Sequence, residues 1–379
     1  MRTFPIVFIL MLSAVVAGCD RILLGDDDST ISLGENLQPP PALNDGWDVS
    51  DLAGENIKAD PIRTLIKNIQ ADPHNIHSLI IIRNNKLVSE SYFDGWHRNR
   101  LHALRSDSKS FVSTLIGIAI DKGQITGVEQ SIFDFFPEYA DLDAGTKDQI
   151  KIRHALTMTI GLQWDESTYA LDDYRNDEYA IERTEDRLRY LLEKKMTNPP
   201  GDYFLYNSGL PILQSAIIRK STGETADIFA KKNLFEPLGI TNYFWRMNND
   251  GYVAVAPLFL TPRDMAKLGQ LFLDSGKWKG KQIVSADWVA AATSKIVSNT
   301  SSFPKKFDTQ TGYGYNWWIE EFTINNNMVH TYAAEGNGGQ YIFVIPELNA
   351  VVVFTGGNYT TNQNAPFGMM RNIILPSMM

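Results

Sequence analysis

Runs of apolar residues favour β-strands near both ends of the chain. Residues 78–82 are apolar, residues 86–92 can form a second strand, and Asn84-Asn85 lies between them. Asparagine tolerates the positive φ of tight hairpin turns, so we expect a hairpin here. The second strand-rich region contains β-branched and aromatic residues and comprises residues 313–319, 328–333, 341–345 and 350–355.

The residues between these two regions favour helices. Residues 178–195 have an amphipathic pattern, and Thr261-Pro262 predicts the start of a helix that continues to residue 274. Further helices are expected at residues 211–220, 285–291 and 369–375.

The simplest fold that uses all these elements is of the α+β class. One antiparallel sheet would be built from both chain ends, at about residues 75–95 and 312–356, with helices flanking it. A mostly helical region would be inserted at about residues 125–295.

The most apolar of the predicted helices begins just after Ser106 and ends near Lys122. Ser106 and Lys109 are three residues apart, so both lie on one face at the helix N-terminus, where the dipole is positive. That dipole disfavours a protonated lysine, and a neutral lysine can accept the proton of an attacking serine. Serine and lysine at this spacing occur about once by chance in a chain of this length. A second match, Ser302 and Lys305, lies in a polar stretch with a proline and is interpreted as a loop.

An aromatic and polar cluster, Tyr206-Asn207-Ser208, follows a Pro-Pro-Gly turn and precedes a predicted helix. A tyrosine can act as a base if a nearby cation lowers its pKa. The alternative is a tyrosine that only packs at the start of a helix.

Three glycines, Gly336, Gly338 and Gly339, lie between two of the predicted C-terminal strands. Glycine lets backbone amides approach a substrate closely, so these residues are candidates for substrate binding. A tight hairpin turn is the alternative reading of the same glycines.

Composition and charge exclude several other classes of protein. The formal net charge is −9 and no stripe of Lys and Arg stands out, so we expect no nucleic-acid partner. The histidines show no metal-ligand spacing, and we expect no catalytic metal and no cofactor. Asp165-Glu166 could supply a carboxylate base after acylation, but the segment is more typical of a solvated loop.

The N-terminal residues 1–18 have the layout of a secretory signal, and the sole cysteine, Cys19, follows Val-Ala-Gly. This junction resembles the lipobox of bacterial lipoproteins, which implies a lipid on Cys19 and a position on the periplasmic side of a membrane. Asp20 weakly favours the inner membrane. Residues 19–60 are polar and are predicted to be a flexible tether, and residues 61–379 the folded domain. An ordinary signal with an unrelated cysteine is the alternative.

Three segments, around Ser106, Tyr206 and Gly336, together resemble the serine β-lactamase and penicillin-binding superfamily. They are nearest the branch related to class C β-lactamases. That branch includes esterases, D-amino-acid peptidases and 6-aminohexanoate-dimer hydrolases. The resemblance begins near residue 61 and also covers residues 156–162 and 260–266. It implies the β-lactamase/transpeptidase-like fold.

The resemblance also implies a role for each matching residue. Ser106 would attack a carbonyl and become acylated, and Lys109 would accept or relay its proton. Tyr206 would share this proton network and later activate water. The backbone amides of Ser106 and Asn337 would form the oxyanion hole, and Asn207 would contact the substrate.

Two motifs depart from the family pattern. Its second motif usually reads Tyr-Ser-Asn, and its third usually begins with a cation, where this chain has Ala334-Glu335-Gly336. A carboxylate-bearing substrate would lack its cationic partner and meet Glu335, which argues against penicillins and D-Ala peptides. His330 could supply the cation only if the alignment were shifted.

The sequence therefore predicts a serine hydrolase that cleaves ester or amide bonds of small molecules through an acyl-enzyme on Ser106. One alternative is a tethered binding or sensor protein of the same fold with little or no turnover. Another is a true β-lactamase or D-amino-acid carboxypeptidase.

Overall fold

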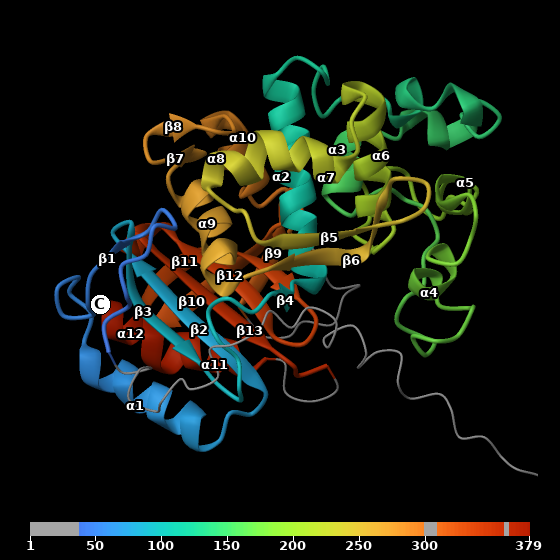
Figure 1. The fold of residues 1–379 in the computed structure, drawn as a ribbon. Helices are drawn as coiled ribbons and strands as arrows, with labels where there is room; N and C mark the ends of the chain where they lie inside the picture. Colours follow the sequence, from blue (N-terminus) through green and yellow to red (C-terminus); the bar gives the residue numbers. More distant parts are fainter. Residues whose placement is uncertain (1–37, 299–308, 360–363) are drawn as a thin grey trace, which may run out of the picture.

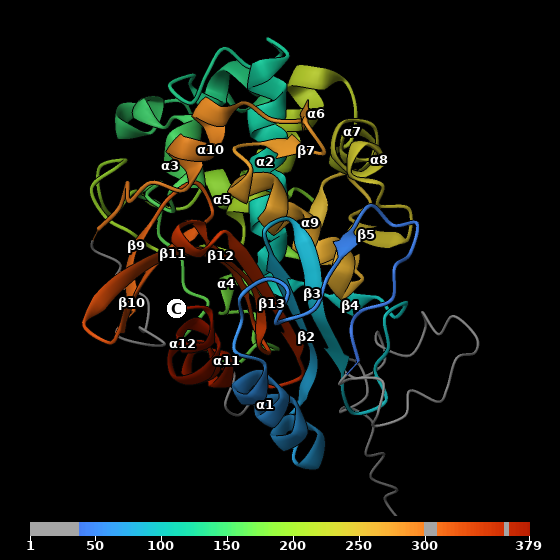
Figure 2. The same cartoon turned by 90° about the vertical axis from the view of Figure 1, so that its left-hand side faces the viewer.

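The computed structural model describes residues 38–298, 309–359 and 364–379. An eight-stranded sheet lies between two layers of helices (Figures 1 and 2). One face is covered by α1 (Ala59–Ala71), α11 (Ala365–Met369) and α12 (Leu375–Met378). The other face packs against α2 (Ser108–Asp121) and α9 (Pro262–Leu273).

Both chain ends contribute to this sheet, as the sequence predicts, because β2 pairs antiparallel with β13. Residues 79–82 of β2 are fully buried, since helices cover both faces of the sheet. Within the described part of the chain, the short β1 alone pairs parallel with its neighbour in this sheet, β3. In sheet order the strands are β1 (Asp48–Val49), β3 (Lys86–Tyr92), β2 (Ile76–Arg83), β13 (Ala350–Gly356), β12 (Gln340–Ile345), β11 (Asn327–Gly336), β10 (Trp318–Ile324) and β9 (Gln310–Tyr313).

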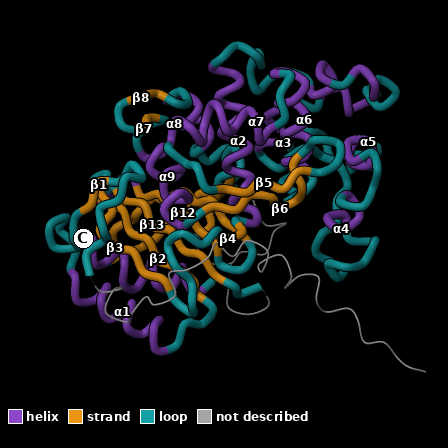
Figure 3. The backbone as a smooth tube through the Cα atoms, viewed as in Figure 1, coloured by secondary structure: helices purple, strands orange, loops and turns teal. Residues whose placement is uncertain are grey.

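The region between the two parts of the sheet is mostly helical but also contains strands. A second sheet, in the order β4-β6-β5, lies among its helices (Figure 3). The sequence analysis did not predict these strands. The elements are β4 (His102–Ala103), α3 (Ile152–Leu156), α4 (Asp177–Ile181), α5 (Arg187–Leu192), α6 (Leu210–Thr222), α7 (Ala226–Ala230), α8 (Glu236–Leu238), β5 (Tyr243–Met247), β6 (Val253–Leu260), β7 (Lys277–Trp278), β8 (Lys281–Gln282) and α10 (Ala286–Ala292).

Two predicted elements are interrupted in the structure. The helix expected over residues 178–195 is two helices, because the Asp186 side chain accepts a hydrogen bond from Arg189 N and starts α5 anew. The strand expected over residues 313–319 is broken between β9 and β10. There Asn316 has a φ of +60° and its side chain donates to Lys109 O at 3.0 Å.

Helix α9 begins as predicted, with the Thr261 side chain accepting a hydrogen bond from Asp264 N. It packs on strands β13, β12 and β2 of the large sheet, so it does not belong to a separate helical insert. Among the described residues, none of the helices is both long and apolar enough to cross a bilayer.

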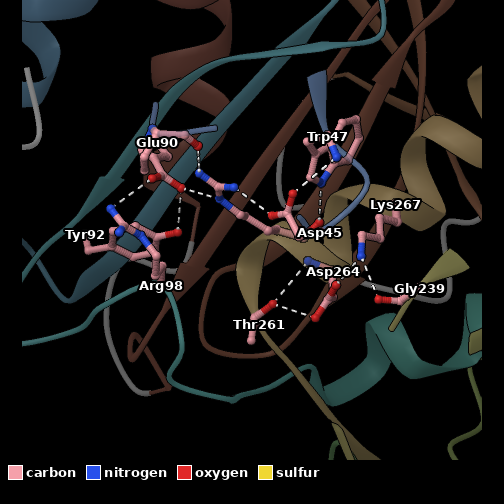
Figure 4. Close-up of polar contacts among 11 residues, drawn as sticks. Asp45, Trp47, Glu90, Tyr92, Arg98, Gly239, Thr261, Asp264 and Lys267 are labelled. Carbon is pink, nitrogen blue, oxygen red and sulfur yellow. Dashed lines mark hydrogen bonds and ion pairs between the residues drawn. The ribbon is translucent and has the colours of Figure 1, made fainter. Parts of the chain in front are cut away.

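The described part of the predicted tether is packed against the domain, so the folded region begins before residue 61. Trp47 is 5% exposed and donates its Nε1–H to Arg263 O at 3.2 Å. Arg263 of α9 pairs with Asp45 and with Glu90 of β3, each at 2.6 Å (Figure 4). The polar composition of the segment gave no sign of these contacts, nor of the buried Leu52 and Ile57 or the pairing of β1 with β3. The predicted signal, Cys19 and the second Ser-x-x-Lys match, Ser302 and Lys305, lie outside the described residues.

Candidate active site

Ser106 lies in a single 3₁₀ turn, η3 (Arg105–Asp107), between β4 and the buried helix α2. The turn packs against β11 and β12, so the serine lies where the helix meets the large sheet. Arg105 has a φ of +55°, a left-handed conformation that a non-glycine residue rarely adopts. Such local strain is often found at functional positions.

Lys109 lies one turn further along, and its Nζ is 2.8 Å from Ser106 Oγ. Its side chain is buried, and this burial lowers the pKa of the ammonium group, against the opposing charges of Glu166 and Glu178. The structure thus brings together the serine and the lysine that the sequence paired, with the lysine shifted toward its neutral form.

Tyr206 also reaches the nucleophile, through a side-chain hydrogen bond to Ser106. Lys109 Nζ lies 4.8 Å from the centre of the Tyr206 ring, and Trp318 stacks on that ring at 6.0 Å. Burial raises the pKa of Tyr206 well above its usual value, although the bond to Ser106 lowers it. The condition considered in the sequence analysis, a cation that lowers this pKa, is therefore not met, and Tyr206 is neutral near pH 7.

Of the next two residues, the sequence analysis gave a role only to Asn207, which it expected to contact the substrate. Asn207 is 1% exposed, and its Oδ1 accepts a hydrogen bond from Gly209 N at 2.8 Å, which holds the turn before α6. Ser208 instead faces the site, with its Oγ 3.5 Å from Lys109 Nζ. Asn207 therefore stabilises its own turn, and Ser208 was the residue missed.

Glu166 is a second missed residue and lies directly behind Ser208. Its carboxylate accepts hydrogen bonds from Ser208 N at 2.8 Å, from Ser208 Oγ at 3.1 Å and from Trp164 Nε1 at 2.6 Å. Burial, with the charge of Glu178, raises the pKa of Glu166 to about 7, against the opposing effect of Lys109. The solvated-loop interpretation is thus wrong for this carboxylate. The loop pattern carried no signal for it, because the contact that turns it toward the site comes from Ser208, 42 residues away.

The glycines of the third segment lie close to other backbone and aromatic groups. A Cβ on Gly336 would come within 2.2 Å of Leu104 O, and one on Gly338 within 2.5 Å of the Tyr359 ring. Gly338 and Gly339 each have a φ of +96°. Strand β11 can therefore approach Leu104, the residue before the nucleophile turn, only with glycine at position 336. Gly338 and Gly339 follow the strand, and Asn337 before them is exposed.

The missing cation of the third motif is not replaced from nearby on β11. Ala334 lies in the core that includes α2. Glu335 is the strand partner of Tyr341, which lies in the core on the other face of the sheet, because alternate residues of a strand face opposite sides. His330 is 62% exposed and bonds Glu347 at 2.7 Å. Among the described residues no group of three His, Cys, Asp or Glu could hold a metal ion.

The sequence profile of one family, described as Beta-lactamase, matches residues 67–370. The chain belongs to this family. The fold and the enzyme class predicted from the sequence, a serine hydrolase, are thereby confirmed.

Individual relatives are distant but span most of the chain. A 6-aminohexanoate-dimer hydrolase from Paenarthrobacter ureafaciens is 24% identical over 85% of this chain and 82% of its own. The solved structure of EstCE1, a hydrolase with promiscuous acyltransferase activity, has a TM-score of 0.69 at 15% identity and covers 85% of this chain and 99% of its own. A D-amino acid amidase from Ochrobactrum anthropi has a TM-score of 0.62 at 14% identity, over 84% and 98% of the two chains.

Proposed function

We propose that this β-lactamase-family hydrolase cleaves ester or amide bonds of small molecules through an acyl-enzyme on Ser106. The observation that carries the proposal is the 2.8 Å contact between Ser106 Oγ and the buried Nζ of Lys109. A nucleophile within hydrogen-bond distance of a base whose pKa is lowered is the arrangement that nucleophilic catalysis needs.

In the proposed first step, Ser106 Oγ forms a bond to the substrate carbonyl carbon and its proton passes to Lys109 Nζ. The carbonyl π electrons move to the oxygen, which the backbone amides of Ser106 and Asn337 would stabilise. Collapse of this intermediate breaks the bond to the leaving alcohol or amine, and Lys109 returns a proton to it.

In the second step, water replaces the leaving group and releases the acid from Ser106. Tyr206 bonds Ser106 and is neutral, so it would relay a proton in this step as a phenol. Asn337 would contribute its backbone amide to the oxyanion hole, so its side chain should matter little. Loss of one such donor typically costs about 3 kcal/mol of transition-state stabilisation.

The substrate would be an ester or amide without a carboxylate next to the scissile bond. Ala334 stands where the family usually has a cation, and His330 is exposed and bonds Glu347, so a penicillin or a C-terminal D-Ala peptide would lack its partner. Two relatives, described as a 6-aminohexanoate-dimer hydrolase and a D-amino acid amidase, support this choice, because their names indicate the cleavage of amides that are not β-lactams.

The test follows hydrolysis of a short-chain p-nitrophenyl ester and of an aliphatic amide by the protein without residues 1–37, with Ser106→Ala as control. We expect turnover by the wild type and none above background by the variant. Absence of turnover and of any covalent adduct on Ser106 would leave the binding or sensor alternative. Rapid penicillin hydrolysis would favour the β-lactamase alternative instead.

We further propose that the chain is anchored through a lipid on Cys19 on the periplasmic side of a bacterial membrane. The support is the Val-Ala-Gly-Cys junction after an apolar segment. Expression of the full chain with a labelled fatty acid should label the wild type and leave Cys19→Ala unlabelled. Equal labelling of both would exclude this anchor.

A further inference from the structure

A continuous line of polar contacts connects the nucleophile to the carboxylate of Glu166. Lys109 Nζ contacts Ser106 Oγ at 2.8 Å on one side and Ser208 Oγ at 3.5 Å on the other. Ser208 Oγ in turn lies 3.1 Å from Glu166 Oε1. Serine, lysine, serine and glutamate thus follow one another from the site into the protein.

The protein holds this carboxylate in place from several directions. Trp164 Nε1 and Ser208 N both donate to Glu166 Oε2, at 2.6 and 2.8 Å. The fully buried Asn176 donates its side-chain amide to the backbone oxygen of Glu166 at 3.3 Å. Asp165 N, one residue earlier, is bonded to Asp177 at 2.7 Å. Glu166 is therefore oriented before any substrate arrives.

We propose that Glu166, acting through Ser208, is a positioning residue that orients Lys109 and stabilises the ammonium formed when Lys109 takes the Ser106 proton. This inference rests on the proposed acyl-enzyme reaction. The proton moves from Ser106 Oγ to Lys109 Nζ and stops there. Ser208 accepts an N–H from Lys109 and donates its own O–H to the ionised Glu166, which takes up no proton in this step. The arrangement serves lysine as the carboxylate of a Ser-His-Asp triad serves histidine.

Other charges also reach Lys109 and determine how the test must be designed. Glu178 and Asp107 raise its pKa as Glu166 does, and burial of Glu178 raises the pKa of that carboxyl as well. The charge of Arg105 lowers the pKa of Glu178. Glu166 also reaches Lys109 through the hydrogen bonds of Ser208, so Glu178→Gln is the matched control for Glu166→Gln.

The experiment compares ester hydrolysis by wild type, Glu166→Gln and Glu178→Gln across pH, with melting temperatures to show that each variant is folded. A charge about 6 Å from the ammonium at an effective dielectric of about 20 contributes roughly 50- to 100-fold, so we expect kcat of Glu166→Gln to fall by that factor with little change in KM. Glu178→Gln should lose clearly less activity than Glu166→Gln, because Glu178 acts on Lys109 through its charge and Glu166 also through the hydrogen bonds of Ser208.

The pH profile separates this role from a purely structural one. Removal of the Glu166 charge lowers the pKa of Lys109, so the acid limb of kcat/KM should move to lower pH in Glu166→Gln even as its plateau falls. Ser208→Ala tests the same path without a charge change. The Glu166→Gln/Ser208→Ala double variant should lose no more activity than the worse single variant, because both act on one path.

Wild-type kcat and pH profile in Glu166→Gln, with Ser106→Ala inactive, would overturn the positioning role and leave the proposed function intact. An equal loss in Glu178→Gln would also overturn it, since a general electrostatic effect would then be sufficient. If Glu166→Gln does not fold, unchanged kcat in folded Ser208→Ala would overturn it. Activity in Ser106→Ala equal to wild type would instead refute the acyl-enzyme itself.

Discussion

Two buried networks of charged and polar groups lie on neighbouring parts of this protein, and their environments act in opposite directions. At Arg263, burial opposes the charge, but the hydrogen bonds and charges of Glu90 and Asp45 outweigh it and raise the pKa of the guanidinium. At the nucleophile, burial lowers the pKa of Lys109 and raises that of Glu166 to about 7. The first network keeps its charges fixed, whereas the second keeps both groups close to a change of protonation.

The difference comes from how each cation is partnered. Arg263 meets two carboxylates directly, each at 2.6 Å, so its charge is satisfied in place. Lys109 Nζ forms its hydrogen bonds to the hydroxyl groups of Ser106 and Ser208, and the carboxylate of Glu166 reaches it through Ser208. A fixed ion pair anchors a segment of chain, whereas a lysine held by hydroxyls can lose its proton and then act as a neutral base.

The largest effect is expected from Lys109→Met. Loss of the proton acceptor should lower kcat/KM by about 1000-fold or more, in the upper range for general base catalysis. The melting temperature should hold or rise, because a buried amine is replaced by an apolar side chain of similar length. Steady-state kinetics and thermal unfolding measure both quantities. Substantial destabilisation would contradict the division between a catalytic and a structural network.

The complementary change is Arg263→Met, which removes the cation of the anchoring network. Glu90 would remain buried without its main partner, so we expect the free energy of unfolding to fall by about 3–5 kcal/mol. The kcat of the molecules that remain folded should be within about 2-fold of wild type. Urea unfolding and active-site titration give the two values. A large fall in kcat at wild-type stability would show that the anchor also serves the site.

An intermediate effect is expected from Tyr206→Phe. The variant keeps the stacking on Trp318 but loses the hydroxyl bonded to Ser106, so kcat should fall by roughly 10²-fold, within the range for a proton-transfer group. Pre-steady-state ester kinetics should show a burst if deacylation is the slower step. Unchanged turnover would remove Tyr206 from the proton network.

The smallest and most graded effect is that of pH on the wild type. Lys109 must lose a proton to act as base and Glu166 must be ionised to stabilise it, so kcat/KM should rise as pH increases through about 7. At pH values well below this rise, kcat/KM should change by about tenfold per pH unit. A rate that falls over the same interval would contradict the assignment of Lys109 as the base. Thermal unfolding across this pH range shows whether unfolding contributes.

Much of the fold and part of the site could be predicted from the sequence because their signals are local or periodic. The apolar and β-branched runs of the strands, the Thr261 cap and the apolar run after Lys109 are each visible within a few neighbouring residues. The packing of the segment around Trp47 against the domain could not be predicted, because the contact of Trp47 with Arg263 joins residues 216 positions apart.

The site divides in the same way. Ser106 and Lys109 share one turn of helix, so their spacing alone predicts the contact. Ser208 and Glu166 are 42 residues apart and meet only when the loop after Trp164 folds over the start of α6. The choice between Asn207 and Ser208 depended on the direction of each side chain at a turn, which spacing does not give.

The most direct test of the central claim is covalent labelling of the active serine. The protein would be incubated with a fluorophosphonate at neutral pH, digested, and the modified residue located by mass spectrometry, with Ser106→Ala and Lys109→Met treated in parallel. The account predicts one adduct on Ser106 in the wild type, none in Ser106→Ala and much slower labelling in Lys109→Met. An unlabelled wild type, or a label on another serine that persists in Ser106→Ala, would contradict it.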